Sequence, residues 1–246
     1  MKNLRSYIAN LSIVVYTIVV GMIVIIFGLF FPKNSSIFHS ISGIWADLIL
    51  KTSGVSVRLN GAEFINPETP YVVMSNHQSY FDVFSLVAKS PISIYFLAKR
   101  ALMWIPVLGW AMYFAGHIAI DRGQRERAIR SVDSAAEKIK NGVNILVFPE
   151  GTRSHDGNLQ SLKKGGFVLA IKAQVPILPV GIYGSRSILP KGAWKITPGS
   201  ITLTFGKPID TKNLTLDDRD NLMEIVHKEI SSLIEKSKNA NVLARK

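Results

Sequence analysis

The chain has 246 residues, which is enough for one sizeable α/β domain and an appendage. It contains no cysteine, which excludes disulfides, thiolate nucleophiles and cysteine-based metal sites. Its five histidines are scattered without metal-ligand spacing, so we expect no metal site. Lysine and arginine outnumber aspartate and glutamate by 29 to 17, a formal charge of +12, and a surface this basic favours anionic partners.

The N-terminal region carries a long apolar run. Leu11–Phe31 holds 21 residues without a charge, about the length that crosses the ~30 Å core of a bilayer. The run is too long for the apolar part of a signal peptide, and no small-x-small cleavage site follows it. Basic residues stand on both sides of it (Lys2, Arg5, Lys33 and Lys51). The run therefore predicts membrane attachment, and leaves open whether it spans the bilayer or dips into one leaflet.

A second amphipathic segment follows at residues 37–50, with apolar side chains at helical spacing on one side. This pattern suits a helix in the membrane interface with Trp45 at headgroup level. It suits equally a helix packed on the soluble domain. We expect residues 1–52 to form a membrane-anchoring helical segment, and basic charge beside an anchor predicts affinity for anionic membrane lipids.

From about residue 55, short apolar runs alternate with helical stretches, which predicts an α/β fold with a central, largely parallel or mixed sheet flanked by helices. We expect this domain to cover residues 53–238, with a basic tail at 239–246. The expected strands are Tyr71–Ser75, Ser93–Leu97, His117–Ile120, Asn144–Phe148, Ile177–Tyr183 and Ile201–Phe205. The expected helices are Asp82–Ala88, Gln124–Lys140, Gly166–Ala173 and Leu216–Lys236, the last capped by Thr215 with Asp218.

The segment NHQSYFD, residues 76–82, leaves the first of these strands and places a carboxylate five residues after a histidine. One helix would turn His77 and Asp82 roughly 140° apart. They can meet only if His77 lies in the loop and Asp82 in the first turn of the next helix. That arrangement would make an oriented general base. An aspartate in a first turn is also favoured by the helix dipole alone, so this segment by itself does not decide.

Three further blocks follow in the chain: GHIAIDR at residues 116–122, LVFPEGTRS at 146–154 and VPILPVGIYG at 175–184. With NHQSYFD and in this order, they resemble the motif series of the glycerolipid acyltransferases. The series is most similar to that of the 1-acyl-sn-glycerol-3-phosphate (lysophosphatidic acid) acyltransferases. FLAKR at residues 96–100, which contains Lys99, precedes the second block and adds to this resemblance. The resemblance covers about residues 55–210.

The resemblance implies an enzyme that moves a fatty acyl group from a thioester of acyl-carrier protein or coenzyme A to the sn-2 hydroxyl of lysophosphatidic acid. The product is phosphatidic acid, made in phospholipid biosynthesis without a further cofactor. His77 would take the hydroxyl proton and Asp82 would fix the imidazole tautomer. Because the acceptor supplies the oxygen, no covalent enzyme intermediate is required. The rival is a seryl intermediate on Ser75 or Ser79, neither of which lies in a G-x-S-x-G elbow.

The same resemblance implies the substrate-binding residues. Guanidinium groups would bind the acceptor phosphate, and the Pro-Glu-Gly turn would shape the site around it. For each cation the ordinary alternative is a solvated surface charge. The implied residues are Lys99, Arg122, Glu150, Gly151, Thr152 and Arg153. The apolar stretch Met103–Trp110 would serve as an acyl-chain slot, a membrane-facing surface or ordinary core.

Two alternatives remain open at this point. One is an acyltransferase of the same superfamily acting on glycerol 3-phosphate or another lysolipid, and the polar His117 in the second block keeps the acceptor open. The other is a non-catalytic, basic, membrane-tethered binding protein. No nucleic-acid-binding motif is present, so we expect no nucleic acid partner. We expect the cytoplasmic membrane as the location, with both N-terminal segments in one leaflet and the active site facing the cytosol.

Overall fold

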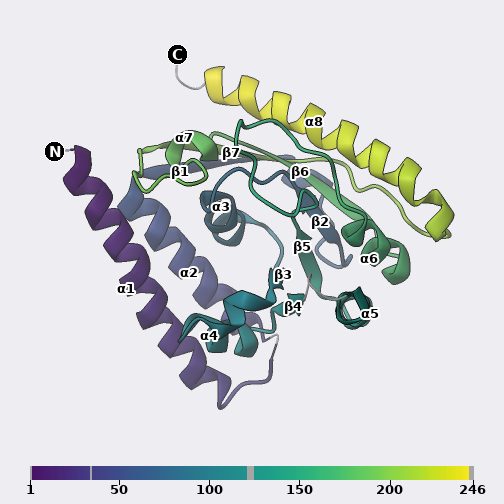
Figure 1. Cartoon of the computed structure of the whole chain (residues 1–246), viewed down its shortest axis with the longest axis horizontal. Helices are drawn as coiled ribbons and strands as arrows, with labels where there is room; N and C mark the ends of the chain where they lie inside the picture. Colours follow the sequence, from purple (N-terminus) through teal and green to yellow (C-terminus); the bar gives the residue numbers. More distant parts are fainter. Residues whose placement is uncertain (1, 34, 121–124, 244–246) are drawn as a thin grey trace.

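A seven-stranded sheet forms the centre of the computed structural model, which describes residues 2–33, 35–120 and 125–243 (Figure 1). The strand order is β1-β7-β6-β2-β5-β3-β4. Neighbouring strands pair in parallel except for β6 and β7, so β1 and β7 run against the other five. The strands are β1 Val55–Asn60, β2 Val72–Ser75, β3 Ile94–Lys99, β4 Ile118–Ile120, β5 Asn144–Val147, β6 Ile177–Tyr183 and β7 Gly199–Phe205. The expected mixed sheet is confirmed.

Helices cover both faces of this sheet, and the sheet separates two apolar clusters. One cluster joins α2 and α3 to one face, and the other joins α5, α6 and α8 to the opposite face. The α-helices are α1 Lys2–Gly28, α2 Ser36–Ser53, α3 Phe81–Lys89, α4 Leu108–Phe114, α5 Arg125–Lys140, α6 Gly165–Ala173, α7 Ser185–Ile188 and α8 Arg219–Leu243. Short 3₁₀ helices are η1 Ala62–Phe64, η2 Arg100–Trp104 and η3 Leu216–Asp218.

The expected strands and helices are present, with most bounds shifted by one or two residues. The last expected helix begins as η3 and continues as α8 to Leu243, into the part expected as a tail. Gln124, the expected start of another helix, lies outside the described residues. Thr215 and Asp218 form the expected capping box: the Thr215 hydroxyl accepts a backbone N–H of the first turn, and the Asp218 carboxylate accepts the backbone N–H of Thr215. β1, α4 and α7 were not predicted. β1 could have been, since Val55, Val57 and Leu59 alternate with polar residues as in a half-buried strand, whereas α4 and α7 are too short to show a helical period.

The N-terminal helix α1 is the one helix of the described residues that is long and apolar enough to cross a membrane, over Leu4–Gly28 with a mean hydropathy of 2.7. Only 11% of its most apolar window is buried in the protein. This helix lies on α2 and α4 along one side of the molecule (Figure 1). Its composition and exposure support membrane association.

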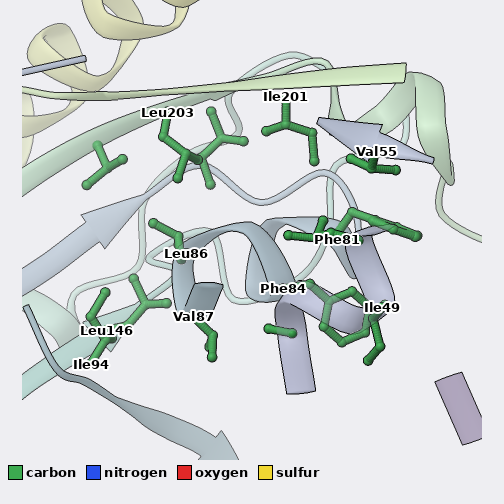
Figure 2. Packing of buried hydrophobic residues seen from close by; sticks show 14 of the residues in the cluster. Ile49, Val55, Phe81, Phe84, Leu86, Val87, Ile94, Leu146, Ile201 and Leu203 are labelled. Carbon is green, nitrogen blue, oxygen red and sulfur yellow. The ribbon is translucent and has the colours of Figure 1, made fainter. Parts of the chain in front are cut away.

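Helix α2 is part of the domain core. Ile49 is fully buried in the same cluster as Phe81 and Phe84 of α3, as Figure 2 shows. The Trp45 ring meets the Phe84 ring edge-on at 5.3 Å, and its Nε1–H donates to Thr17 Oγ1 at 3.2 Å. Of the two arrangements that the sequence allowed, the structure shows α2 as a helix packed on the domain, and Trp45 lies between α1 and α3.

Candidate active site

The four sequence blocks converge because of the strand order. The blocks lie on or directly after β2, β4, β5 and β6. Together with β3 these strands are parallel in the order β6-β2-β5-β3-β4, so their carboxyl ends lie at one edge of the sheet. We call this the carboxyl edge; ligands of open α/β sheets bind outside such an edge. His77 follows β2, Glu150 follows β5, and Lys99 ends β3. Arg122, which follows β4, lies outside the described residues.

His77 and Asp82 form the pair that the spacing predicted. Asp82 lies in the first turn of α3, and its Oδ2 is 2.9 Å from His77 Nδ1. The same oxygen accepts the backbone N–H groups of Gln78 at 2.7 Å and Ser79 at 2.9 Å. A carboxylate oxygen that already accepts two N–H groups also accepts a hydrogen bond from Nδ1–H, so in the neutral ring Nε2 is the basic nitrogen.

The surroundings of the pair fix the ring in place. The His77 ring stacks on Phe148 with centroids 3.9 Å apart and planes inclined by 13°. The His77 carbonyl accepts the Ser154 N–H at 2.7 Å. The Asp82 side chain is fully buried, whereas 16% of the His77 side chain is exposed. A substrate at the carboxyl edge can therefore reach the imidazole but not the carboxylate.

Glu150 ties the turn after β5 to the histidine loop. Its Oε1 accepts the His77 N–H at 2.6 Å and its Oε2 accepts the Gln160 N–H at 3.1 Å. Burial raises the pKa of this carboxyl, while the two backbone donors oppose the rise. Gly151, next in the turn, has φ +74°, a left-handed conformation that favours glycine. Glu150 and Gly151 thus shape the loop that carries His77.

We expect Glu150→Ala to lower the free energy of unfolding by roughly 2–4 kcal/mol, because it leaves two backbone N–H groups without their acceptor. Urea denaturation of the full chain in detergent, followed by circular dichroism, measures the loss. Glu150→Gln, which keeps one acceptor oxygen, should lose less. The matched control is Glu137→Ala, since 70% of the Glu137 side chain is exposed. Equal stability of the two alanine variants would contradict this role for Glu150.

Two of the predicted cationic residues, Arg153 and Lys99, lie at the carboxyl edge. The Arg153 guanidinium lies 3.8 Å from the centre of the Tyr80 ring, which holds it in one orientation. Lys99 is exposed at the end of β3. Thr152 Oγ1 accepts from Lys191 Nζ at 3.1 Å, and the same ammonium donates to the Arg153 carbonyl at 2.9 Å.

The supporting roles of three residues were not predicted, although Ser79 was considered as a rival nucleophile. Lys191 lies beyond the four blocks, and no local pattern indicates that it reaches Thr152. Gln78 Nε2 donates to the Gly157 carbonyl at 2.7 Å, and Ser79 Oγ donates to the Leu189 carbonyl at 2.8 Å. Gln78 and Ser79 could have been selected as part of NHQSYFD, but their partners are set by tertiary contacts.

The histidine of the second block has a structural contact. His117 Nδ1 accepts the Phe96 N–H at 3.1 Å, which requires that nitrogen to be unprotonated. Burial, with the charge of Lys138 as a smaller cause, lowers the pKa of His117 to about 4. The hydrogen bond between His117 and β3 thus explains why a polar residue stands in the second block.

Comparison with known proteins gives a consistent picture. The sequence model of the family described as Acyltransferase matches residues 56–183. A 1-acyl-sn-glycerol-3-phosphate acyltransferase of Limnanthes douglasii is 34% identical over 190 residues, 77% of this chain and 66% of the relative. The human 1-acyl-sn-glycerol-3-phosphate acyltransferase alpha is 37% identical over 166 residues, 67% of this chain and 59% of the relative. The aligned part of this chain thus spans at most about two thirds of these relatives.

A solved structure is similar over nearly the whole chain. The crystal structure of the 1-acyl-sn-glycerophosphate acyltransferase PlsC from Thermotoga maritima superposes with a TM-score of 0.82 and 29% sequence identity. The match covers 97% of this chain and 98% of that one, so it includes α1 and α2 as well as the sheet.

Proposed function

Since this chain belongs to the acyltransferase family, we propose that it transfers a fatty acyl group from an acyl thioester to the sn-2 hydroxyl of 1-acyl-glycerol-3-phosphate, making phosphatidic acid. The observation that carries the proposal is the His77–Asp82 pair at the carboxyl edge, with Nδ1 held by the buried carboxylate. The names of the similar proteins support the choice of acceptor. The donor is a thioester of acyl-carrier protein or coenzyme A.

The pair supplies the base that the reaction requires. An alcohol is a weak nucleophile near neutral pH, and His77 Nε2 takes its proton as the oxygen attacks the thioester carbonyl. The imidazolium that forms is stabilised by Asp82 Oδ2. As the tetrahedral intermediate collapses, the C–S bond breaks and the thiolate takes the proton from Nε2. The ester and a free thiol leave, and the ring is neutral again.

A covalent route through a serine has less support. The hydroxyls of Ser75 and Ser79 donate to main-chain carbonyls, those of Asn76 at 3.1 Å and Leu189 at 2.8 Å. Both serines are fully buried. Neither hydroxyl is bonded to the imidazole, so direct transfer to the acceptor oxygen is the simpler mechanism.

The acceptor phosphate requires cations beside the pair. We assign Arg153 to it, since its guanidinium is already oriented by Tyr80 and forms paired bonds with phosphate oxygens. Lys99 at the end of the neighbouring strand adds charge from the same edge, and Arg122 is proposed for the same role from its place in the second block. Glu150, Gly151 and Thr152 hold the loop that presents Arg153.

We expect Arg153→Ala to raise the KM for the acceptor by roughly 10- to 100-fold with a smaller change in kcat, because a charge-assisted contact is worth about 1.5–3 kcal/mol. Steady-state kinetics with each substrate varied in turn measures this. Arg186→Ala is the matched control, since its guanidinium is exposed and donates to the His155 carbonyl. A raised KM for the donor with an unchanged KM for the acceptor would mean that Arg153 binds the donor and not the acceptor.

A panel of substrates tests the proposed function itself. The purified chain is incubated with labelled acyl-carrier protein or coenzyme A thioesters and one of several acceptors: lysophosphatidic acid, another lysophospholipid, or glycerol 3-phosphate. We expect labelled phosphatidic acid with lysophosphatidic acid as the best acceptor. Preference for another acceptor would favour the superfamily alternative. No transfer from any donor would favour a non-catalytic, membrane-tethered protein that binds anionic lipid.

Contacts along the whole of α1 support a position in one leaflet. Near its start, Ser6 Oγ donates to the Ile196 carbonyl at 3.0 Å and Asn10 Nδ2 to the Trp194 carbonyl at 2.9 Å. Near its end, a Cβ at Gly28 would collide with the Phe114 ring of α4. A spanning α1 would draw these domain segments across the bilayer core, where polar backbone is costly. We propose that α1 lies along the cytosolic leaflet, with the carboxyl edge facing its headgroups.

Cysteine labelling tests this orientation, which the cysteine-free chain permits. We expect Asn3→Cys and Ser35→Cys, on either side of α1, to react with a membrane-impermeant thiol reagent from the cytosolic side alone. Inside-out and right-side-out vesicles from the same cells give the two sides, and detergent-lysed vesicles show that each cysteine can react. Labelling of the two positions from opposite sides would mean that α1 spans the bilayer.

A further inference from the structure

Three of the four tryptophans lie exposed on the protein. The Trp104 side chain is 79% exposed, Trp110 62% and Trp194 50%. Tryptophan is usually well buried, and a group of exposed large apolar side chains marks an interaction surface. The fourth, Trp45, is half-buried between helices.

Two of the exposed tryptophans belong to segments that contact α1, and the third is next to one of them. The Trp194 ring lies against the Tyr7 ring at the start of α1, with centroids 5.0 Å apart and planes inclined by 36°. Trp104 ends η2 and Trp110 lies in α4, and α4 packs on the second half of α1. The exposed tryptophans therefore lie near both ends of the apolar helix, Trp194 near its start and the η2–α4 segment near its end.

The segment η2–α4 carries further features of an interfacial surface. Leu102, Ile105 and Tyr113 are also exposed, and Lys33 Nζ lies 3.5 Å above the Tyr113 ring. Val107 has φ +64°, an uncommon and costly conformation for a β-branched residue. The same Val107 side chain packs against Gly21 of α1. The turn is thus held in a conformation that places apolar side chains outward beside α1.

We propose that η2–α4 (Arg100–Phe114) and Trp194 insert into the headgroup–acyl boundary of the leaflet that receives α1, so that the catalytic domain contacts the bilayer through its own side chains. Tryptophan and tyrosine prefer this boundary because their rings are apolar and their N–H or O–H groups remain hydrated. Continuity with α1 identifies the lipid bilayer as the occupant. Lys99 directly precedes the segment and Arg100 begins it, and both cations suit anionic headgroups.

This contact has a consequence for the geometry at the carboxyl edge. η2 begins immediately after Lys99, which ends β3 at that edge. Trp194 lies on the connection between α7 and β7, far along the sheet from β3. Two insertion points on the domain, together with α1, fix both the depth and the tilt of the domain. An N-terminal tether alone would fix neither.

Tryptophan fluorescence tests the proposal on the full chain. Four variants each keep one tryptophan and carry phenylalanine at the other three positions. Each is reconstituted into vesicles of phosphatidylcholine and phosphatidylglycerol, with or without bromine on the acyl chains. Bromine quenches only rings close to it. Trp45, enclosed by α1, α2 and α3, is the internal control.

We expect brominated lipid to lower the emission of the Trp104, Trp110 and Trp194 variants at least twofold, and that of the Trp45 variant much less. Bromine close to the headgroups should quench more than bromine near the chain ends. If the three exposed tryptophans were quenched no more than Trp45, the proposal would be wrong. A dimer in analytical ultracentrifugation, with unquenched tryptophans, would mean that a second copy covers this surface. The readout requires no turnover, so it stands apart from the proposed acyl transfer.

Discussion

Replacing His77 by alanine is expected to abolish acyl transfer, with a loss of at least 100-fold in kcat. The side chain supplies the only imidazole beside the carboxyl edge that is paired with a buried carboxylate in the described part of the chain. General-base catalysis is worth typically 10²–10⁴ in rate, and no other described group is placed to replace it. Formation of labelled phosphatidic acid from lysophosphatidic acid and an acyl thioester measures the loss.

The variant should stay folded, because the backbone bonds of residue 77 to Glu150 and Ser154 do not involve the ring. Circular dichroism and vesicle binding check this. His155→Ala is the matched control, since His155 is exposed on the neighbouring loop. If His77→Ala retained a tenth of wild-type turnover, the general-base assignment would fail.

Asp82→Asn is expected to lower kcat by several orders of magnitude, by analogy with the roughly 10⁴-fold loss in a serine-protease triad. Asparagine has nearly the same shape, so its amide oxygen can still accept the Gln78 and Ser79 N–H groups that Oδ2 accepts now. It carries no charge and therefore cannot stabilise the imidazolium. Kinetics with saturating donor and acceptor isolate this effect on kcat.

Asp82→Ala separates catalysis from folding. It leaves the two backbone N–H groups without an acceptor and should lower the free energy of unfolding by roughly 2–4 kcal/mol more than asparagine does. Asp156→Asn, on an exposed loop, is the control for a change of charge near the site. An Asp82→Asn enzyme with unchanged kcat would show that the carboxylate serves only to fold the histidine loop.

The sequence alone determined the fold class, most strands and helices, and the His77–Asp82 pair. These features depend on local information: apolar period, capping residues and short blocks of fixed spacing. The five-residue spacing requires a loop followed by a helix if the two side chains are to meet, and a strand stands directly before it. For the same reason the acyltransferase blocks could be recognised without knowledge of the sheet.

Tertiary structure decided what depends on contacts between distant segments. It placed Ile49 of α2 in the core beside α3, a choice that the amphipathic pattern left open because both a membrane and a protein core accept an apolar face. It paired both carboxylate oxygens of Glu150 with backbone N–H groups, and it placed the Lys191 ammonium within hydrogen-bond distance of Thr152. It also exposed Trp104 and Trp110, in a stretch for which the sequence had left an acyl-chain slot, a membrane-facing surface or ordinary core open. The hydrophobicity of a side chain predicts that it leaves water, but only the packing of the whole chain decides whether it is buried in a protein core or faces a membrane.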